Sequence, residues 1–191
     1  MYFIADAYLK ETFSKVIVSD ETLHKKVFEE CHFDHCSFTN CKMEKCKFIN
    51  CRFESCILST VMPLDCRFQE TRFFRCKLMG MDWTRTAELS EPDFQECQLN
   101  FSNFKLLKIP GIKMVNCEAK EVDFIETDLS KGDFHQTDFE NSRFFKTNLS
   151  SANFKGAKNY SIDVKANILK KTRFSLPEVL LLLNSLDIII E

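Results

Sequence analysis

A five-residue period constrains this chain more than any other feature. The ten cysteines lie five residues, or a multiple of five, from one another, apart from one slip of a single residue. They are Cys31, Cys36, Cys41, Cys46, Cys51, Cys56, Cys66, Cys76, Cys97 and Cys117. The residue two positions after each cysteine is large and apolar in every case except Ala119. The cysteines therefore mark a repeat, which has to be assigned before any motif is interpreted.

We call the apolar residue of each five its centre. Centres recur at every fifth residue from Phe28 to Trp83 and again from Leu89 to Phe154, so the frame slips by one residue within 84–88. The residue two positions before a centre is usually small: Cys, Thr, Ser, Ala or Gly. A period of five fits neither a helix nor a simple strand. It predicts a coil that turns a corner after every repeat, with the centre and the small residue pointing inward.

Two fives resemble the loose consensus A-(D/N)-L-x-x of the pentapeptide-repeat proteins. They are Ala152-Asn153-Phe154-Lys155-Gly156 and Thr127-Asp128-Leu129-Ser130-Lys131. The resemblance implies an all-β fold, a right-handed quadrilateral β-helix, in which four fives make one coil. Such coils stack at the ~4.8 Å spacing of neighbouring strands. A solenoid of this kind buries its core only by stacking, so both of its ends need a cap.

We expect three parts along the chain. Residues 1–27 keep only a weak echo of the frame, because Asp6, Glu11 and Glu21 occupy the small inward position, and this predicts an irregular N-terminal cap. Residues 28–158 should form the β-helix, with its register slip at 84–88. Residues 159–191 should form a C-terminal cap with a short helix over 176–186.

The C-terminal cap has its own sequence signals. Ser175-Leu176-Pro177-Glu178 is typical of a capping box with proline inside the start of a helix, and Ile188-Ile189-Ile190 predicts a final strand. The helix is apolar on nearly every side, so it should be buried on the last coil, on a second subunit, or on both. The candidate dimer contacts are Val179, Leu180, Leu182, Leu183, Leu186 and Ile188.

The segment Cys31-His32-Phe33-Asp34-His35-Cys36 looks like a metal cluster. In the repeat frame, however, its cysteines point inward and its histidines point outward, so they cannot converge on one tetrahedral ion. A buried cysteine acts as a small hydrophobe, and a catalytic thiol needs exposure and a neighbouring base. No phosphate loop, nucleophile elbow or zinc-protease motif is present. We therefore expect no enzyme activity, no metal and no cofactor.

The compartment follows from the cysteines and from the N-terminal residues. Ten cysteines would suit a secreted disulfide scaffold, but residues 1–20 carry charges throughout and lack the apolar core of a signal peptide. No run approaches the ~18 apolar residues that cross a membrane. We expect a cytoplasmic protein with reduced thiols and no membrane contact.

Charge is distributed unevenly along the chain. Residues 88–140 hold twelve acidic and five basic residues, whereas residues 143–173 hold eight basic residues and one acidic residue. Outward positions just before the centres supply a candidate acidic belt for partner binding: Glu88, Asp93, Glu118, Asp123, Asp128, Asp133 and Asp138. Such a belt either attracts a basic groove or simply keeps the rod soluble. A continuous acidic stripe would favour the first interpretation, and mixed charge would favour the second.

The tail narrows the resemblance to the Qnr/McbG-like branch, through Asn159-Tyr160-Ser161-Ile162-Asp163 and the segment 170–178. The resemblance implies a homodimer joined through its C-terminal caps. It also implies a rod that mimics duplex DNA, binds DNA gyrase or topoisomerase IV, and protects the enzyme from quinolones or toxins. Acidic charge could then borrow the attraction of basic grooves for phosphate, without direct nucleic acid binding. The alternative is a structural or adaptor β-helix with another protein partner.

Overall fold

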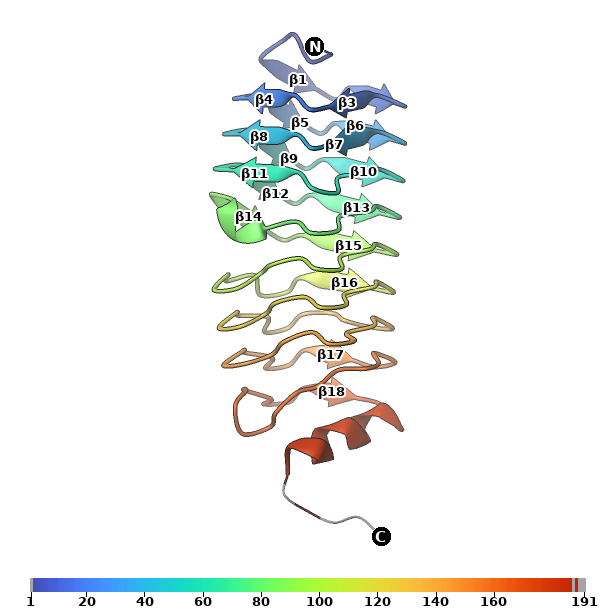
Figure 1. Cartoon of the computed structure of the whole chain (residues 1–191), viewed down its shortest axis with the longest axis vertical. Coiled ribbons are helices and arrows are strands. Elements are labelled where there is room, and N and C mark those ends of the chain that lie inside the picture. The colour runs from blue at the N-terminus through green and yellow to red at the C-terminus, as the bar shows by residue number, and fades with distance from the viewer. Residues whose placement is uncertain (1, 187, 189–191) are drawn as a thin grey trace.

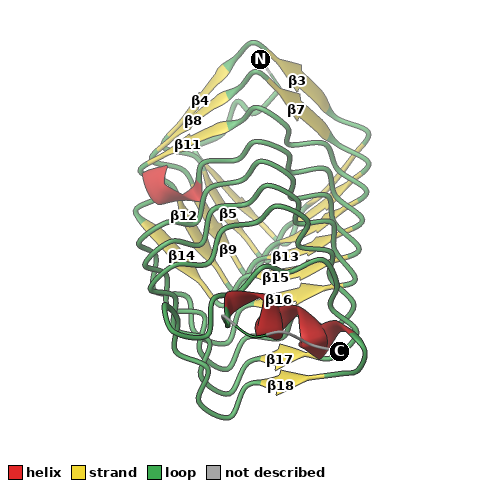
Figure 2. Cartoon of the chain, turned by 60° about the horizontal axis from the view of Figure 1, so that its bottom comes forward, coloured by secondary structure: helices red, strands yellow, loops and turns green. Residues whose placement is uncertain are grey.

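The chain winds into a right-handed parallel β-helix with four walls and about eight turns, as the five-residue period predicts (Figure 1). This computed structural model describes residues 2–186 and residue 188. The N-terminal coil forms one end of the rod, and a short helix crosses the other end (Figure 2). No helix in the described part of the chain is long and apolar enough to span a membrane.

Each wall is a stack of three-residue strands from successive turns, which shorten to two residues near the C-terminal end. Wall 1 consists of β1 (Ala7–Leu9), β5 (Val27–Glu29), β9 (Lys47–Ile49), β12 (Arg67–Gln69) and β14 (Glu88–Ser90). Wall 2 consists of β2 (Thr12–Ser14), β6 (His32–Asp34), β10 (Arg52–Glu54), β13 (Arg72–Phe74), β15 (Asp93–Gln95) and β16 (Lys113–Val115), with β17 (Asn153–Phe154) and β18 (Arg173–Phe174) further down. Wall 3 begins with β3 (Ile17–Ser19) and β7 (Ser37–Thr39), and wall 4 with β4 (Thr22–His24), β8 (Lys42–Glu44) and β11 (Met62–Leu64).

All strand pairs are parallel, and each residue lies beside the residue one turn further along the chain. Phe28 pairs with Phe48, for example, and Phe33 pairs with Phe53. Towards the C-terminus the walls continue mainly as single bridges, such as Asn103 to Asp123. Because the register repeats, every sequence position has a fixed wall and a fixed direction.

The inside of the solenoid is filled by the centres and the small residues. Phe rings of successive turns stack, with 4.4 Å between the ring centroids of Phe33 and Phe53. All ten cysteines are buried and free. The thiol of Cys56 donates to the carbonyl of Phe33 at 3.3 Å, and the hydroxyl of Thr127 donates to Phe104 in the same way at 2.9 Å. Cysteine here is a small core residue with one weak donor.

Each corner is made by the residue two positions after a centre. These residues have a left-handed backbone, with φ between 47° and 64° at the non-glycine positions. Their side chains therefore project from the edges of the rod, and many are Lys, Glu or Asn. A glycine relieves the backbone strain at such a position, as Gly80 does at φ 70°.

The irregular cap expected over 1–27 is wrong, because β1 to β4 already follow the repeat. Asp6 and Glu11 are exposed at inward positions, since no coil lies above the first one to bury them. The true cap is shorter and centres on Phe3, which is fully buried and packs edge-on against Phe13 and Phe28. The first coil thus tolerates carboxylates where later coils bury a small side chain, most often cysteine or threonine.

The capping segment is also tied down by a buried lysine. Lys26 occupies an inward position and is 6% exposed. Its ammonium donates to the carbonyl of Ile4 at 3.2 Å and to the carboxylate of Asp6 at 3.1 Å. These two bonds compensate the burial of the charge and hold the segment across the open end.

The register slip is a bulge combined with a 3₁₀ turn, η1 (Trp83–Arg85). The backbone N–H groups of Ala87 and Glu88 both donate to the carbonyl of Cys66, at 2.8 and 3.3 Å, so two residues oppose one. Arg67 consequently pairs with a residue 21 positions further on instead of 20. The sequence located this slip correctly but did not reveal its geometry.

The C-terminal helix differs from the expectation in type and in capping. It is a 3₁₀ helix, η2 (Glu178–Ser185), shorter than the 176–186 predicted. The predicted capping box is wrong, because Pro177 is the N-cap and no side chain caps the helix. The hydroxyl of Ser175 instead accepts a bond from the backbone of Gly156 at 2.8 Å, which ties the tail to the last coils. The predicted strand at 188–190 lies outside the described residues apart from Ile188, which is not in a strand.

Candidate partner-binding surface

The seven carboxylates of the expected acidic belt do not lie together. They are spread over all four walls of the solenoid. Wall 1 carries Glu88 and Asp128, wall 2 carries Asp93 and Asp133, wall 3 carries Glu118 and Asp138, and wall 4 carries Asp123. A partner that approaches one wall therefore meets at most two of them.

The columns of outward residues also alternate in charge. On wall 2 the residues before the centres run Arg72, Asp93, Lys113 and Asp133 from coil to coil. The ammonium of Lys113 lies 3.8 Å from the carboxylate of Asp93. On walls 1 and 4, Arg67 lies 3.1 Å from Glu88 and Arg143 lies 2.5 Å from Asp123. The surface is mixed in charge and does not form a continuous acidic stripe.

Four of these aspartates have a local structural role. The Oδ1 atoms of Asp123, Asp128, Asp133 and Asp138 each accept the backbone N–H two residues further on, at 3.0 to 3.3 Å. Asn148 accepts the same bond at 3.1 Å, without a charge. Aspartate and asparagine both close such a turn. The repeat thus selects Asp or Asn here for backbone geometry, so the acidic residues at these positions do not by themselves indicate a basic partner.

Asp138 is the most enclosed of the seven, with 11% of its side chain exposed. Burial by itself would raise the pKa of this carboxyl, but the side-chain amide of Asn159 donates to it at 2.8 Å. The backbone of Glu140 and the ammonium groups of Lys120 and Lys158 also favour the ionised form, and the net effect lowers its pKa. Asp138 is therefore a charged anchor inside a network and has little freedom to bind a partner.

Glu118 is the exception among the seven. It is exposed, forms no ion pair within the described residues, and receives one long contact of 3.5 Å from Asn100.

Two shallow hollows of about 330 and 310 Å³, which share Arg72 and Asp93, were not predicted from the sequence. These hollows depend on side chains from neighbouring coils, which a one-dimensional pattern does not bring together.

The apolar face of η2 is the second candidate surface. None of the residues of η2 is buried within the chain, although Leu181 and Leu182 pack against the core. Of the six predicted dimer contacts, Leu180 is 54% exposed and Ile188 is 53% exposed, whereas Val179, Leu182, Leu183 and Leu186 are half-buried. Leu176, which is not among the predicted contacts, is 76% exposed. A 3₁₀ helix has three residues per turn, so Leu180, Leu183 and Leu186 line one edge.

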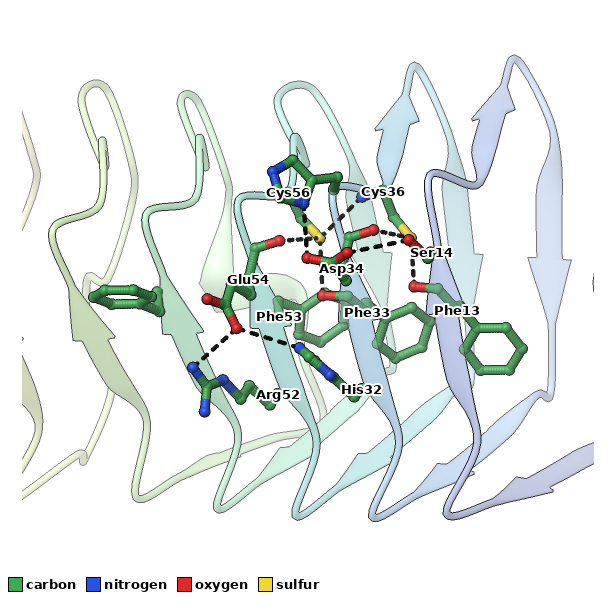
Figure 3. A network of polar contacts seen from close by, with 12 residues as sticks. Phe13, Ser14, His32, Phe33, Asp34, Cys36, Arg52, Phe53, Glu54 and Cys56 are labelled. Atoms are coloured by element: carbon green, nitrogen blue, oxygen red, sulfur yellow. Dashed lines mark hydrogen bonds and ion pairs between the residues drawn. The ribbon is translucent and has the colours of Figure 1, made fainter.

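The segment 31–36 has the arrangement predicted for repeat packing. Figure 3 shows His32 outside the coil, with its Nε2 atom 3.4 Å from Glu54, while the thiol of Cys36 points inward and donates to the carbonyl of Phe13 at 3.2 Å. His35 lies outside as well, 2.7 Å from Asp34. In the described part of the chain no group of three or more His, Cys, Asp or Glu side chains is arranged to hold a metal.

Eight of the ten buried thiols have raised pKa values, whereas the hydrogen bond with Cys66 lowers the pKa of Cys46. Burial raises the pKa of Cys51 to about 12, and burial is also the main cause of the raised pKa values of Cys31, Cys41 and Cys97. For Cys36 the main cause of the raised pKa is the neighbouring thiol of Cys56. A thiol needs to ionise before it can act as a nucleophile. These cysteines are therefore packing residues at neutral pH.

Comparisons with known proteins agree with this architecture. No curated protein matches the sequence. The structure of a trypsin-treated variant of QnrB1, a plasmid-mediated fluoroquinolone resistance protein, is 15% identical, with a TM-score of 0.67 over 98% of this chain and 100% of that one. A second trypsin-treated variant of QnrB1 is 16% identical, with a TM-score of 0.57 over 97% of each chain.

Matches to family models assign the chain to a family, which the distant structures alone do not. A model described as a pentapeptide repeat region matches residues 26–104 and 46–124, and a model of eight pentapeptide repeats matches residues 123–158. Together they span the coils in which centres, small residues and corners recur every five positions. On this basis the chain belongs to the pentapeptide-repeat family.

Proposed function

We propose that this chain is a non-catalytic binding rod that works as a homodimer. The observation that carries the proposal is the apolar end of the rod, where Leu176, Leu180 and Ile188 are more than half exposed. Exposed apolar side chains gathered at one place mark interaction surfaces. A second copy of the chain would cover the edge of η2 by a twofold contact, in which the same residues meet.

Dimerisation is tested by light scattering on the purified protein. We expect a dimer for the wild type and a monomer for the double variant Leu180→Asp, Leu183→Asp. The control is Leu106→Asp, because Leu106 is 62% exposed at a corner far from η2. A monomeric wild type, or a control that dissociates equally, would contradict the proposal.

As the first target we propose DNA gyrase or topoisomerase IV. The support is likeness, since the trypsin-treated variant of QnrB1, a fluoroquinolone resistance protein, has the same fold along the whole of its chain. A rod of duplex-like width could compete with DNA for a positively charged groove, and no bond would be made or broken. The mixed charge of the walls is what weakens this target and keeps the adaptor with another protein partner as the second candidate.

A gyrase supercoiling assay separates the two candidates. We expect inhibition of supercoiling, or protection from ciprofloxacin, at micromolar protein if the rod binds the enzyme. The variant Glu118→Gln, Asp128→Asn should weaken the effect if acidic charge is used, since asparagine preserves the turn, as Asn148 does. Glu29→Gln, Glu70→Gln is the control with the same charge change. Absence of any effect would leave the adaptor interpretation.

A further inference from the structure

Five basic side chains gather on one edge of the C-terminal coils. They lie at the corner between walls 1 and 2 and on wall 2, and they form what we call the C-terminal basic patch: Lys131, Lys155, Lys170, Lys171 and Arg173. All five are exposed. The backbone N–H of Lys131 donates to Ser150, and that of Ser151 donates to Lys170, which stacks three coils in register at this corner.

No acidic side chain neutralises this patch within the described part of the chain. None of its five members forms an ion pair there, whereas Arg143, Lys146 and Lys158 of the same coils pair with Asp123, Glu126 and Asp138. Residues 143–173 contain a single acidic residue, Asp163. The five cations at this edge are therefore unpaired within the described residues, although the net charge of the chain is −2.

The carboxylates nearest to the patch along the walls are already engaged. The side-chain amide of Asn148 donates to Asp128 at 3.0 Å, and that of Asn153 donates to Asp133 at 2.8 Å. Asn153 in turn lies directly beside Arg173 in the β17–β18 pair. Hydroxyl groups of Ser150 and Ser151 stand at the corner between the lysines. The edge thus presents ammonium, guanidinium and hydroxyl donors with few free acceptors.

We propose that the C-terminal basic patch binds the phosphate backbone of a nucleic acid. Phosphate oxygens are contacted in complexes mainly by Arg and Lys, together with Ser and Asn side chains, which is the donor set found here. Recognition of an acidic protein would use apolar anchors as well, and the exposed Ile168 and Leu176 lie beside the patch, so acidic protein is the competing occupant that the test has to separate from phosphate. Binding should be independent of base sequence, because among the described residues no helix or hairpin projects from this edge to enter a groove.

This inference goes beyond the proposed function and does not depend on it. It departs from the expectation that the chain does not bind nucleic acid, which rested on an acidic belt whose carboxylates are dispersed and mostly engaged. Asp128 and Asp133 lie on the same two walls as the patch and lower its potential without pairing with it in the described part of the chain. Carboxylates on walls 3 and 4 act weakly on DNA bound at the patch, since charges are screened over about 10 Å at 0.1 M salt. If the dimer forms through η2, two patches would flank the joint.

Fluorescence anisotropy with a labelled 20-base-pair duplex tests the proposal on the full-length protein. We expect binding at low salt that weakens as salt rises. The variant Lys170→Gln, Lys171→Gln, Arg173→Gln removes three cations, so the slope of log K against log salt should flatten by about 2.7. Between 50 and 200 mM salt the wild type should therefore lose about 40-fold more affinity than the variant.

The control is Lys42→Gln, Lys47→Gln, Lys77→Gln, which removes three exposed lysines of other coils that form no ion pair within the described residues. Its slope should match the wild type. A second variant, Lys131→Gln, Lys155→Gln, keeps the test valid if the triple variant does not fold. No binding at 50 mM salt, or equal slopes for the patch variant and the control, would overturn the proposal. Displacement by polyglutamate as effective as by unlabelled duplex would assign the patch to acidic proteins and overturn the assignment to phosphate.

Discussion

At the scale of single residues, the inward small position accepts two kinds of side chain for the same purpose. In one column on wall 3, the backbone of Cys97 donates to the sulfur of Cys117 at 3.4 Å. One coil further, the backbone of Cys117 donates to the hydroxyl of Thr137 at 3.2 Å. Both side chains fill a similar volume and point their proton at a main-chain carbonyl. The cysteines thus reflect packing and hydrogen bonding and not redox chemistry.

This equivalence predicts different effects for two substitutions of Cys76, whose thiol donates to Phe53 and accepts from the backbone of Cys56. Cys76→Thr should lower the free energy of unfolding by less than about 1 kcal/mol, because the hydroxyl can replace both bonds. Cys76→Ala should cost about 1–2 kcal/mol, since it leaves a small cavity and an unpaired N–H. Urea unfolding measures both. Equal costs would show that the hydrogen bonds are unimportant.

A second residue-scale prediction concerns acid. Because the folded state lowers the pKa of Asp138, the carboxylate stabilises the fold above its ordinary pKa near 4, and this stabilisation is lost as the pH falls below it. Asp138→Asn keeps the turn but removes the charge. The stability difference between wild type and variant should therefore be present at pH 7 and shrink as the pH falls below the ordinary pKa of an aspartate, about 4. Urea midpoints measured over this range give the result; a difference independent of pH would contradict it.

The candidate partner-binding surface was predictable from the sequence only in part. The sequence placed all seven carboxylates at outward positions, and the period alone sufficed for that. It did not indicate that a period of five distributes successive positions over four walls, so that Asp123, Asp128 and Asp133 face three directions. Nor did it distinguish a free carboxylate from one that accepts a backbone N–H.

At the scale of elements, the repeat predicted the walls well and the irregular parts poorly. Centres and small residues specify inward positions directly, so the strands and the location of the slip followed from the sequence. The first coil was missed because its inward carboxylates look like a broken frame, although they merely face an open end. The geometry of η1 and η2 depends on a few local bonds that have no period.

The third prediction concerns the hydrogen bonds that Asp82 accepts at the start of η1. Asp82 accepts bonds from the backbone of Thr84 at 3.3 Å, from its hydroxyl at 2.6 Å and from Arg85 at 3.0 Å, and thereby caps η1 at the slip. Asp82→Ala should destabilise the protein by about 0.5–2 kcal/mol, the usual cost of a lost N-cap.

Thermal or urea unfolding checks this prediction. Asp82→Asn is the matched variant, because its carbonyl can still accept the bonds from Thr84, and it should retain most of the stability. If both variants are as stable as the wild type, η1 is held by the burial of Trp83 alone, which is fully enclosed by Phe68, Phe73 and Phe94.

At the scale of the whole molecule, stacking adds the small energetic contributions of the individual coils into the stability of the whole rod. Stability in a solenoid is roughly the sum of repeats and their contacts. Eight buried thiols have raised pKa values: Cys31, Cys36, Cys41, Cys51, Cys56, Cys66, Cys76 and Cys97. All eight favour the protonated form in the same core, so their effects on pH dependence should add.

The last prediction is a steep loss of stability in alkali. In the unfolded chain each thiol ionises near pH 8.5, whereas in the folded protein it keeps its proton to higher pH. The unfolded state then binds fewer protons, so the free energy of unfolding falls as the pH rises. Each such thiol contributes about 1.4 kcal/mol per pH unit above its unfolded pKa, and eight would contribute about 11. Since domains are stable by about 5–15 kcal/mol, the rod should unfold by roughly pH 10.

Urea midpoints between pH 7.5 and 10 measure this slope, in a window mostly below the ionisation of Lys and Tyr. The matched variant replaces Cys36, Cys56, Cys76 and Cys97, one column of wall 3, by threonine, which should keep their hydrogen bonds. Its slope should be about half that of the wild type, because half of the eight thiols are gone. A slope that does not depend on the number of cysteines would mean that the folded core ionises as readily as the unfolded chain, and that water reaches the thiols inside the coil.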